Sequence, residues 1–305
     1  GAYRQWAIPA GTPGIRYRPP NGGGAVLKVL VTGSRGQLGS DVCKELETRG
    51  IPYCGVSTRE CDITDAKAVD ALLESCRPDA VIHCAAYTAV EKAESERERC
   101  WQVNADGTRS LALACRRTDA KLLYISTDYV FSGEGDQPHR VDDPTGPLNV
   151  YGETKLAGEQ AVRELLEHHW IVRTSWVFGN HGSNFVKTML RLGAEREDVR
   201  VVDDQVGSPT YTGDLAKLLC DMAAGDKYGT YHAANAGFCS WAEFAREIFR
   251  MAGLPTRVLP VSTAEYPSKA VRPMNSRLDQ SALRKAGFQP LPHWKDALNV
   301  FFNRA

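Results

Sequence analysis

The sequence lacks the features that mark secreted, membrane-spanning and nucleic-acid-binding proteins. Its nine cysteines form no CxxC pair and are odd in number, so we expect reduced, mostly structural thiols and a cytoplasmic location. No apolar run reaches the ~18 residues of a membrane span. Since 37 Lys and Arg balance 37 Asp and Glu, no net field attracts nucleic acid or an anionic membrane. A small-molecule partner is therefore predicted.

The first 26 residues differ from the rest of the chain. They are rich in Gly and Pro, have no apolar core and do not begin with Met, unlike a secretory signal. We expect residues 1–26 to be a disordered leader or a cloning remnant and leave them out of the fold prediction.

From Leu27 onward, short apolar runs alternate with longer amphipathic stretches, which is typical of βα units around a parallel sheet. Strands are expected at 27–32, 51–57, 79–85, 121–127 and 170–178. Helices are expected from 37 to a closing Gly50, from a capping Asp65 to Cys76, and over 95–117 and 150–169. The sequence therefore predicts an α/β fold, a Rossmann-like doubly wound parallel sheet over 27–178 that binds a dinucleotide.

The pattern loosens after residue 178. Helices are expected at 183–196, 212–224, 240–252 and 293–303, and short strands near 199–202, 229–233 and 257–261. We expect residues 179–305 to form mainly a smaller C-terminal α/β substrate lobe, with some segments returning to the Rossmann domain. Ligands bind at the carboxyl ends of the strands in such sheets. The polar loop 132–149 is long enough to contribute to binding.

A glycine-rich motif lies between the first strand and its helix. Gly33-Ser34-Arg35-Gly36-Gln37-Leu38-Gly39 has the spacing GxxGxxG. Glycines let the backbone turn tightly and approach a pyrophosphate, and the helix N-terminus offers unpaired N–H groups. Dinucleotide binding is the better interpretation, and a purely structural turn is the alternative.

The residues after the second strand indicate which dinucleotide is bound. An acid there would bind the ribose hydroxyls of NAD, but the run 56–59 (VSTR) has none. With Arg35 in the glycine loop, NADP(H) is favoured and NAD(H) stays possible; alternatively, both arginines are solvated. Asp62 and Ile63 could bracket the adenine, although Asp62 could equally be a turn or cap residue.

Tyr151 and Lys155 suggest a reaction in which a proton is donated to a carbonyl oxygen. They stand at i and i+4 on one face of a helix. A phenol is a poor proton donor at neutral pH until a nearby cation lowers its pKa, and Lys155 can supply that cation. The spacing YxxxK is common by chance, so it indicates a catalytic pair only together with the glycine motif upstream.

A hydroxyl is expected beside this pair, at the carboxyl end of the strand 121–127. Ser126 and Thr127 are both candidates to hydrogen-bond a substrate carbonyl. Because alternate residues of a strand point to opposite faces, only one of them should be catalytic.

Longer strings in the chain resemble the dTDP-4-dehydrorhamnose reductase family of extended short-chain dehydrogenases. The resemblance rests on GxxGQLG, CAAYTAVEKAE (84–94), STDYVFSG (126–133), PLNVYGETKLAGE (147–159), RTSWVFG (173–179) and DDQVGSPT (203–210). It extends from about residue 27 to the C-terminus and leaves residues 1–26 without a counterpart. It implies reduction of the C4 keto group of dTDP-4-dehydro-L-rhamnose by NADPH, in dTDP-rhamnose biosynthesis.

The resemblance also implies roles for individual residues. Thr127 would be the catalytic hydroxyl, Tyr151 the proton donor and Lys155 its activator. The dinucleotide would be held by Gly33, Arg35, Gly36, Gln37, Leu38, Asp62, Ile63, Ala85, Ala86 and Tyr87, together with Tyr151 and Lys155. The dTDP-sugar would be held by Thr127, Asp128, Trp176 and Arg272, although Trp176 could be an ordinary apolar residue and Arg272 a surface arginine.

Three further expectations concern the oligomeric state, a metal site and alternative functions. A homodimer is expected from the resemblance. Some family members bind Mg²⁺ through acidic side chains, for which Asp203 and Asp204 are candidates, but a DD pair is usually a solvated turn and we predict no metal site. The alternatives are a non-catalytic dinucleotide-binding regulatory subunit of the same fold, or a nucleotide-sugar epimerase or dehydratase.

Overall fold

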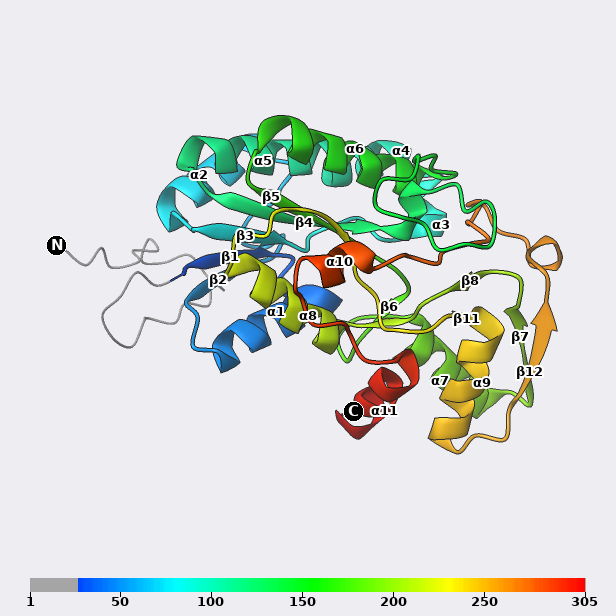
Figure 1. The fold of residues 1–305 in the computed structure, drawn as a ribbon. Coiled ribbons are helices and arrows are strands. Elements are labelled where there is room, and N and C mark those ends of the chain that lie inside the picture. Colours follow the sequence, from blue (N-terminus) through cyan, green and yellow to red (C-terminus); the bar gives the residue numbers. More distant parts are fainter. Residues whose placement is uncertain (1–26, 305) are drawn as a thin grey trace.

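The computed structural model describes residues 27–304 and arranges them around one six-stranded parallel sheet (Figure 1). The strand order is β10-β5-β4-β3-β1-β2, so the chain winds outward in both directions from β1. The strands are β1 (Val29–Thr32), β2 (Tyr53–Val56), β3 (Ala80–His83), β4 (Lys121–Thr127), β5 (His169–Thr174) and β10 (Gly229–His232). This confirms the predicted Rossmann-like α/β fold.

Helices cover both faces of the sheet, because its strands are apolar on both sides (Figure 1). One face packs against α1 (Gln37–Thr48) and α8 (Thr212–Ala223). The other packs against α2 (Ala66–Cys76), α5 (Gly107–Thr118) and α6 (Val150–Leu165). In sheets of this kind, ligands bind at the carboxyl ends of the strands.

Several predicted boundaries are confirmed, and each has a local cause. The Asp65 side chain accepts hydrogen bonds from the N–H groups of Lys67 and Ala68 and so caps α2. Gly50 follows α1 with φ +68°, a conformation that favours glycine. Strand β4 spans the predicted residues 121–127.

The helix predicted over 150–169 and the strand predicted over 170–178 are wrong at their ends. Helix α6 stops at Leu165, because β5 already begins at His169, which pairs with Leu122 of β4. Strand β5 in turn ends at Thr174. Trp176, with φ +49°, redirects the chain into the short β6, which pairs with β9 outside the main sheet.

The long helix predicted over 95–117 is interrupted. The segment consists of α4 (Arg97–Trp101), a π-helical turn (Gln102–Asp106) and α5. The turn places Asn104 so that its side chain bonds both the N–H (2.8 Å) and the carbonyl (3.0 Å) of Tyr87. The helical irregularity therefore fixes the loop that follows β3.

Residues beyond 178 build a second, mostly separate core that is rich in aromatic side chains. The elements that contribute to this core are β6 (Val177–Phe178), α7 (Phe185–Glu195), β7 (Asp198–Val202), β9 (Thr210–Tyr211), β11 (Cys239–Ser240), α9 (Trp241–Ala252), β12 (Arg257–Val261) and α11 (Trp294–Arg304). The remaining short elements are α3 (Val90–Ala93), β8 (Val206–Gly207) and α10 (Ser281–Lys285). Figure 1 shows α7, α9, α11, β7 and β12 beside the sheet, whereas β10 and α8 belong to the sheet layers.

Two further sequence expectations concern the N-terminal segment and membrane-spanning helices. The expectation for residues 1–26 lies outside the described residues. Within residues 27–304, none of the helices has both the length and the apolar character that crossing a bilayer requires.

Candidate active site

The glycine loop forms a tight cradle at the carboxyl end of β1. Gly33 has φ +63°, and a Cβ there would lie 2.7 Å from the amide nitrogen of Ala85. At Gly39 a Cβ would lie 2.0 Å from the carbonyl oxygen of Gly33. Only glycine fits at these two positions, so the loop lies directly against the end of β3.

Helix α1 begins immediately after this cradle. Its N-cap is Gly36, which has no side chain to bond the first N–H groups, and its first turn holds no acid. Such a helix start attracts an anion through its N–H groups and its dipole. Gln37 bonds Asn184 from the C-terminal region at 2.8 Å, and Leu38 packs into the core beneath.

The carboxyl end of β2 carries an acid that the sequence analysis missed. The Glu60 side chain is almost fully buried; one oxygen pairs with Arg35 at 3.1 Å, and the other accepts bonds from the N–H and hydroxyl of Ser57. These bonds and Arg35 lower the pKa of Glu60 against the opposing effect of burial. The guanidinium of Arg35, half-exposed, is therefore held over the end of β2.

The other predicted dinucleotide residues lie along the same edge. Asp62 accepts bonds from the N–H (3.0 Å) and hydroxyl (2.7 Å) of Thr64, so it does serve as a turn residue. Ile63 is buried. The N–H of Ala85 donates to Thr32 (3.1 Å), and Ala86 and Tyr87 continue the loop that Asn104 fixes.

Thr127 and Tyr151 are brought together at the end of β4. The Thr127 hydroxyl lies near the phenol of Tyr151 and favours the ionised form of that phenol. Helix α6 presents Tyr151 in its first turn, because the Asn149 side chain caps that helix by accepting from the N–H of Gly152 at 2.8 Å. Thr127 is itself oriented by bonds to Asp128 (3.1 Å) and from the N–H of Tyr129 (3.1 Å).

Ser126, the other candidate for the catalytic hydroxyl, has a different partner. Its Oγ donates to a carboxylate oxygen of Glu159 at 2.5 Å in the protein interior. The two hydroxyls of the strand end are thus separated, as strand alternation requires, and Thr127 is the one that meets Tyr151.

The expected effect of Lys155 on Tyr151 is not seen. Burial raises the pKa of the Tyr151 hydroxyl, the Asp128 carboxylate raises it further, and the nearby Thr127 hydroxyl opposes them. The Lys155 ammonium lies instead over the ring of Tyr124, 4.5 Å from its centroid. Burial lowers the pKa of Lys155 to about 8, while Glu159 opposes the shift.

Asp128 is a buried acid with unused bonding capacity. It is 3% exposed, and its Oδ2 has no hydrogen-bond partner among the described residues. Burial raises its pKa to about 6, against hydrogen bonds from Ser276 and Thr127 that lower it. Since buried polar atoms are nearly always bonded, Oδ2 fits a hydroxyl supplied by a ligand.

Of the two remaining predicted sugar residues, Trp176 follows β5 and packs against the C-terminal core, and Arg272 lies in the C-terminal region. Trp176 stacks on Trp241 with ring centroids 3.7 Å apart, in the strained backbone conformation noted above. Arg272 donates to the Tyr129 hydroxyl (2.8 Å) and pairs with Glu91 (3.1 Å). It is therefore tied to the end of β4 rather than free on the surface.

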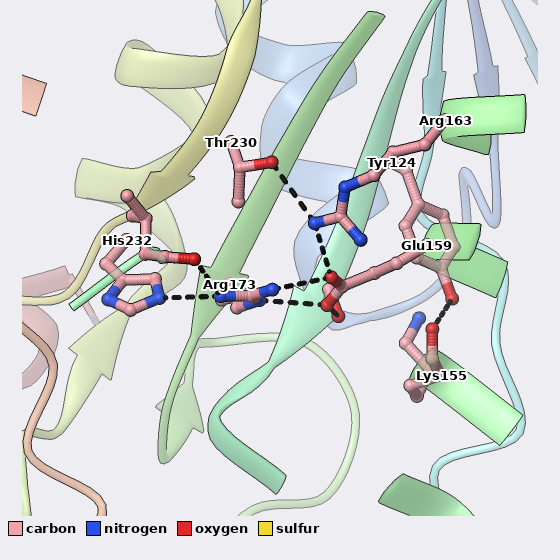
Figure 2. A network of polar contacts seen from close by, with 9 residues as sticks. Tyr124, Lys155, Glu159, Arg163, Arg173, Thr230 and His232 are labelled. Atoms are coloured by element: carbon pink, nitrogen blue, oxygen red, sulfur yellow. Dashed lines mark hydrogen bonds and ion pairs between the residues drawn. The ribbon is translucent and has the colours of Figure 1, made fainter. Parts of the chain in front are cut away.

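A buried ionic network that the sequence analysis missed lies behind Lys155 (Figure 2). Glu159 pairs with Arg173 at 2.8 Å and with Arg163 at 2.9 Å. One signal could have revealed it. Arg173 is a charged residue within the apolar strand WIVRTSWVF, and a central strand buried on both faces can hold a charge only beside a counter-ion.

The candidate magnesium ligands are engaged elsewhere. Asp203 accepts from the Ser240 hydroxyl (2.5 Å), and Asp204 accepts from the N–H and hydroxyl of Thr263. Over residues 27–304, no group of three or more His, Cys, Asp or Glu side chains is placed to hold a metal ion.

A family model and two known proteins match most of this chain. A family model described as RmlD substrate binding domain matches residues 27–305. A dTDP-4-dehydrorhamnose reductase of Streptomyces griseus is 47% identical over 280 residues, which cover 90% of this chain and 92% of that protein. A dTDP-4-keto-6-deoxy-D-glucose reductase of Streptomyces niveus is 41% identical and covers 90% of this chain and 96% of its own length.

Two solved structures share this fold, at different levels of sequence identity. A dTDP-4-dehydrorhamnose reductase from Bacillus anthracis, solved in complex with NADP, has a TM-score of 0.90 and 44% identity, covering 92% of this chain and 100% of that one. A UDP-glucose 4-epimerase from Thermus thermophilus, solved with NAD, has a TM-score of 0.76 at 21% identity over 91% of this chain and 98% of that one. The second likeness shows the fold alone.

Proposed function

This chain belongs to the RmlD substrate binding domain family, and from that premise we propose that it reduces the C4 keto group of dTDP-4-dehydro-L-rhamnose to dTDP-L-rhamnose. The observation that carries the proposal is the meeting of Thr127 and Tyr151 at the end of β4, one helical turn before Lys155 and beside the glycine cradle.

The residues at the cradle fit NADP(H). The close approach at Gly33 and Gly39 and the uncapped start of α1 suit a pyrophosphate. Arg35, held over the end of β2, suits the 2′-phosphate, and the relative from Bacillus anthracis was solved with NADP. NAD(H) stays possible, because Glu60 lies at the same strand end. When bound, the dinucleotide supplies the hydride.

The protein's part in the chemistry is to orient the carbonyl and move one proton. Tyr151 is protonated at neutral pH, and it can donate its proton despite its raised pKa because the oxygen at C4 becomes a strongly basic alkoxide as the hydride arrives. Thr127, near the Tyr151 hydroxyl, can hydrogen-bond the same substrate oxygen. Lys155 is charged below about pH 8 and can hold the nicotinamide ribose.

Substrate residues are proposed on the same basis. The unpaired Oδ2 of Asp128 accepts from a sugar hydroxyl. Trp176 packs on the sugar. Arg272 presents its guanidinium to the diphosphate, for which it would exchange its pair with Glu91.

Organisation and location are also proposals. We assign residues 27–178 to dinucleotide binding and 179–305 mainly to the substrate lobe, with α8 and β10 returning to the sheet layers. A homodimer rests on the family resemblance, and light scattering would test it. A cytoplasmic location is supported by the nine cysteines, none of which forms a disulfide among the described residues.

The test follows NADPH absorbance with enzymatically generated dTDP-4-dehydro-L-rhamnose. Catalytic NADPH loss supports the proposal. Binding of NADPH without turnover favours the regulatory subunit, and a cofactor that copurifies without exchanging favours the epimerase or dehydratase. Because one relative is named for dTDP-4-keto-6-deoxy-D-glucose, that sugar is assayed in parallel, and faster turnover of it would reassign the substrate.

Tyr151→Phe is the matched variant for this assay. It removes the proton donor and keeps the ring, so kcat should fall about 10²-fold or more while NADPH affinity stays within a few-fold of the original. Near-full activity in this variant would mean that another group donates the proton.

A further inference from the structure

A buried carboxylate lies one helical turn beyond Lys155 and has no part in the mechanism described above (Figure 2). Glu159 is completely buried and accepts four hydrogen bonds. The donors are the Ser126 hydroxyl (2.5 Å), Arg173 Nε (3.0 Å) and Nη2 (2.8 Å), and Arg163 Nη2 (2.9 Å). Both carboxylate oxygens are therefore fixed in direction.

These bonds join the elements that carry the reactive groups. Ser126 directly precedes Thr127 on β4, whereas Glu159 shares α6 with Tyr151 and Lys155. A short hydrogen bond between Ser126 and Glu159 thus ties the strand of the hydroxyl to the helix of the phenol and the ammonium. A shift of α6 along β4 would break that bond.

The network is anchored from the far side by Arg173. Its guanidinium is 2% exposed, donates to the carbonyl of Val141 (3.1 Å) and contacts His232 Nε2 (3.2 Å) (Figure 2). Burial and Arg173 lower the pKa of His232 to about 3, so this imidazole is neutral. Glu159 is the counter-ion that allows Arg173 to be buried.

We propose that Glu159 is a positioning residue: it ties α6, which carries Tyr151 and Lys155, to the end of β4 beside Thr127, and it supplies the buried negative charge that balances the Lys155 ammonium. The inference deepens the proposed function and rests on it for the role of Lys155.

The charges around Lys155 support the second part. The groups that face it are His83 and Cys84 at the end of β3, Tyr124 on β4, Cys100 on α4, and Tyr151 and Glu159 on its own helix. Burial lowers the pKa of His83 to about 3 and raises the pKa of both thiols, so these groups are uncharged at neutral pH. Among these described groups, only Glu159 carries a negative charge to offset the desolvation of the ammonium.

The test is a direct titration of Lys155 in the full chain. Lysine labelled with carbon-13 at Cε is followed by NMR between about pH 6 and about pH 10, and Lys155→Met assigns the signal. Glu159→Gln should lower the pKa of Lys155 by about one unit. The pH above which NADPH affinity falls should move down with it.

Two variants separate charge from structure. Ser126→Ala removes a bond to the same carboxylate but keeps its charge, so the Lys155 titration should stay in place. Glu159→Asp keeps the charge and should restore the titration that Glu159→Gln shifts. A folded Glu159→Gln protein with an unmoved titration overturns the proposal, as does an equal shift in Ser126→Ala.

A further variant covers the case in which Glu159→Gln does not fold. Arg163 is 38% exposed and pairs with the same carboxylate, so Arg163→Met removes a cation with little risk to folding. The Lys155 titration should then move to higher pH, and a move to lower pH contradicts the inference. A chain that shows these shifts and binds NADPH but reduces no keto-sugar refutes the proposed function alone.

Discussion

At the scale of the residue, the carboxyl group of Asp128 lies in the protein interior with one oxygen unpaired. Its folded pKa of about 6 exceeds its ordinary value of 3.8, so at neutral pH the ionised group destabilises the fold by an amount on the order of 3 kcal/mol. The unpaired oxygen that carries this cost is suited to accept a hydrogen bond from a ligand hydroxyl.

Asp128→Asn should therefore raise the melting temperature at about pH 8 while it weakens binding of the keto-sugar. Because the folded state takes up the proton of Asp128 as pH falls through about 6, the gain should shrink toward about pH 4. Thermal unfolding across this range measures it.

Asp279→Asn provides the control of opposite sign. Asp279 accepts bonds from the N–H and hydroxyl of Ser281, which hold its pKa below the usual value. Its loss should destabilise the protein above that pKa and matter less as pH falls through it. A stabilisation by Asp279→Asn, or a pH-independent effect of Asp128→Asn, would contradict this account.

What the sequence could predict at this scale follows from distance along the chain. Tyr151 and Lys155 are one helical turn apart, so their pairing on one face is visible in the sequence. Glu60 and Glu159 acquire their roles from Arg35 and Arg173, which are distant in sequence, and only the fold brings those charges together. For the same reason the pKa of Tyr151, set by burial, was predicted with the wrong sign.

At the scale of the element, strands and helix starts were predictable where a local bond defines them. Asp65 caps α2 and Gly50 ends α1 by local geometry. The end of α6 depends instead on the pairing of His169 with Leu122, a contact between two strands. The turn at Trp176 likewise exists because β6 leaves the sheet to pair with β9.

The glycine cradle gives a prediction with a matched control. Gly33 and Gly50 both have positive φ, +63° and +68°, so an alanine at either should cost about 1–2 kcal/mol of backbone strain. A Cβ at Gly33 would meet Ala85, whereas at Gly50 nothing lies within 4 Å. Gly33→Ala should therefore also weaken NADPH binding by about tenfold or more.

Fluorescence titration with NADPH, together with thermal unfolding, distinguishes the two effects. Gly50→Ala should bind NADPH normally at a temperature where it is folded. If both variants bound NADPH equally well, the cradle would not be the pyrophosphate site.

At the scale of the whole molecule, the parallel sheet and the C-terminal region bring different residues to the proposed site. The sheet supplies the cradle, Thr127 and the helix that carries Tyr151. The C-terminal region supplies Trp241, on which Trp176 stacks, and Arg272, which is tied to Tyr129. The division into two parts stays a prediction of the sequence pattern, whereas the strained turn at Trp176 and the pair of Arg272 with Glu91 arise only in the fold.

The most direct measurement of the central claim follows the hydride itself. NADPH deuterated at the transferable position of C4 is incubated with the protein and dTDP-4-dehydro-L-rhamnose, and the product is examined by NMR. The account predicts one deuterium at C4 of the sugar in the original protein and almost no product with Tyr151→Phe. A product without deuterium at C4, or undiminished labelling rates in Tyr151→Phe, would contradict it.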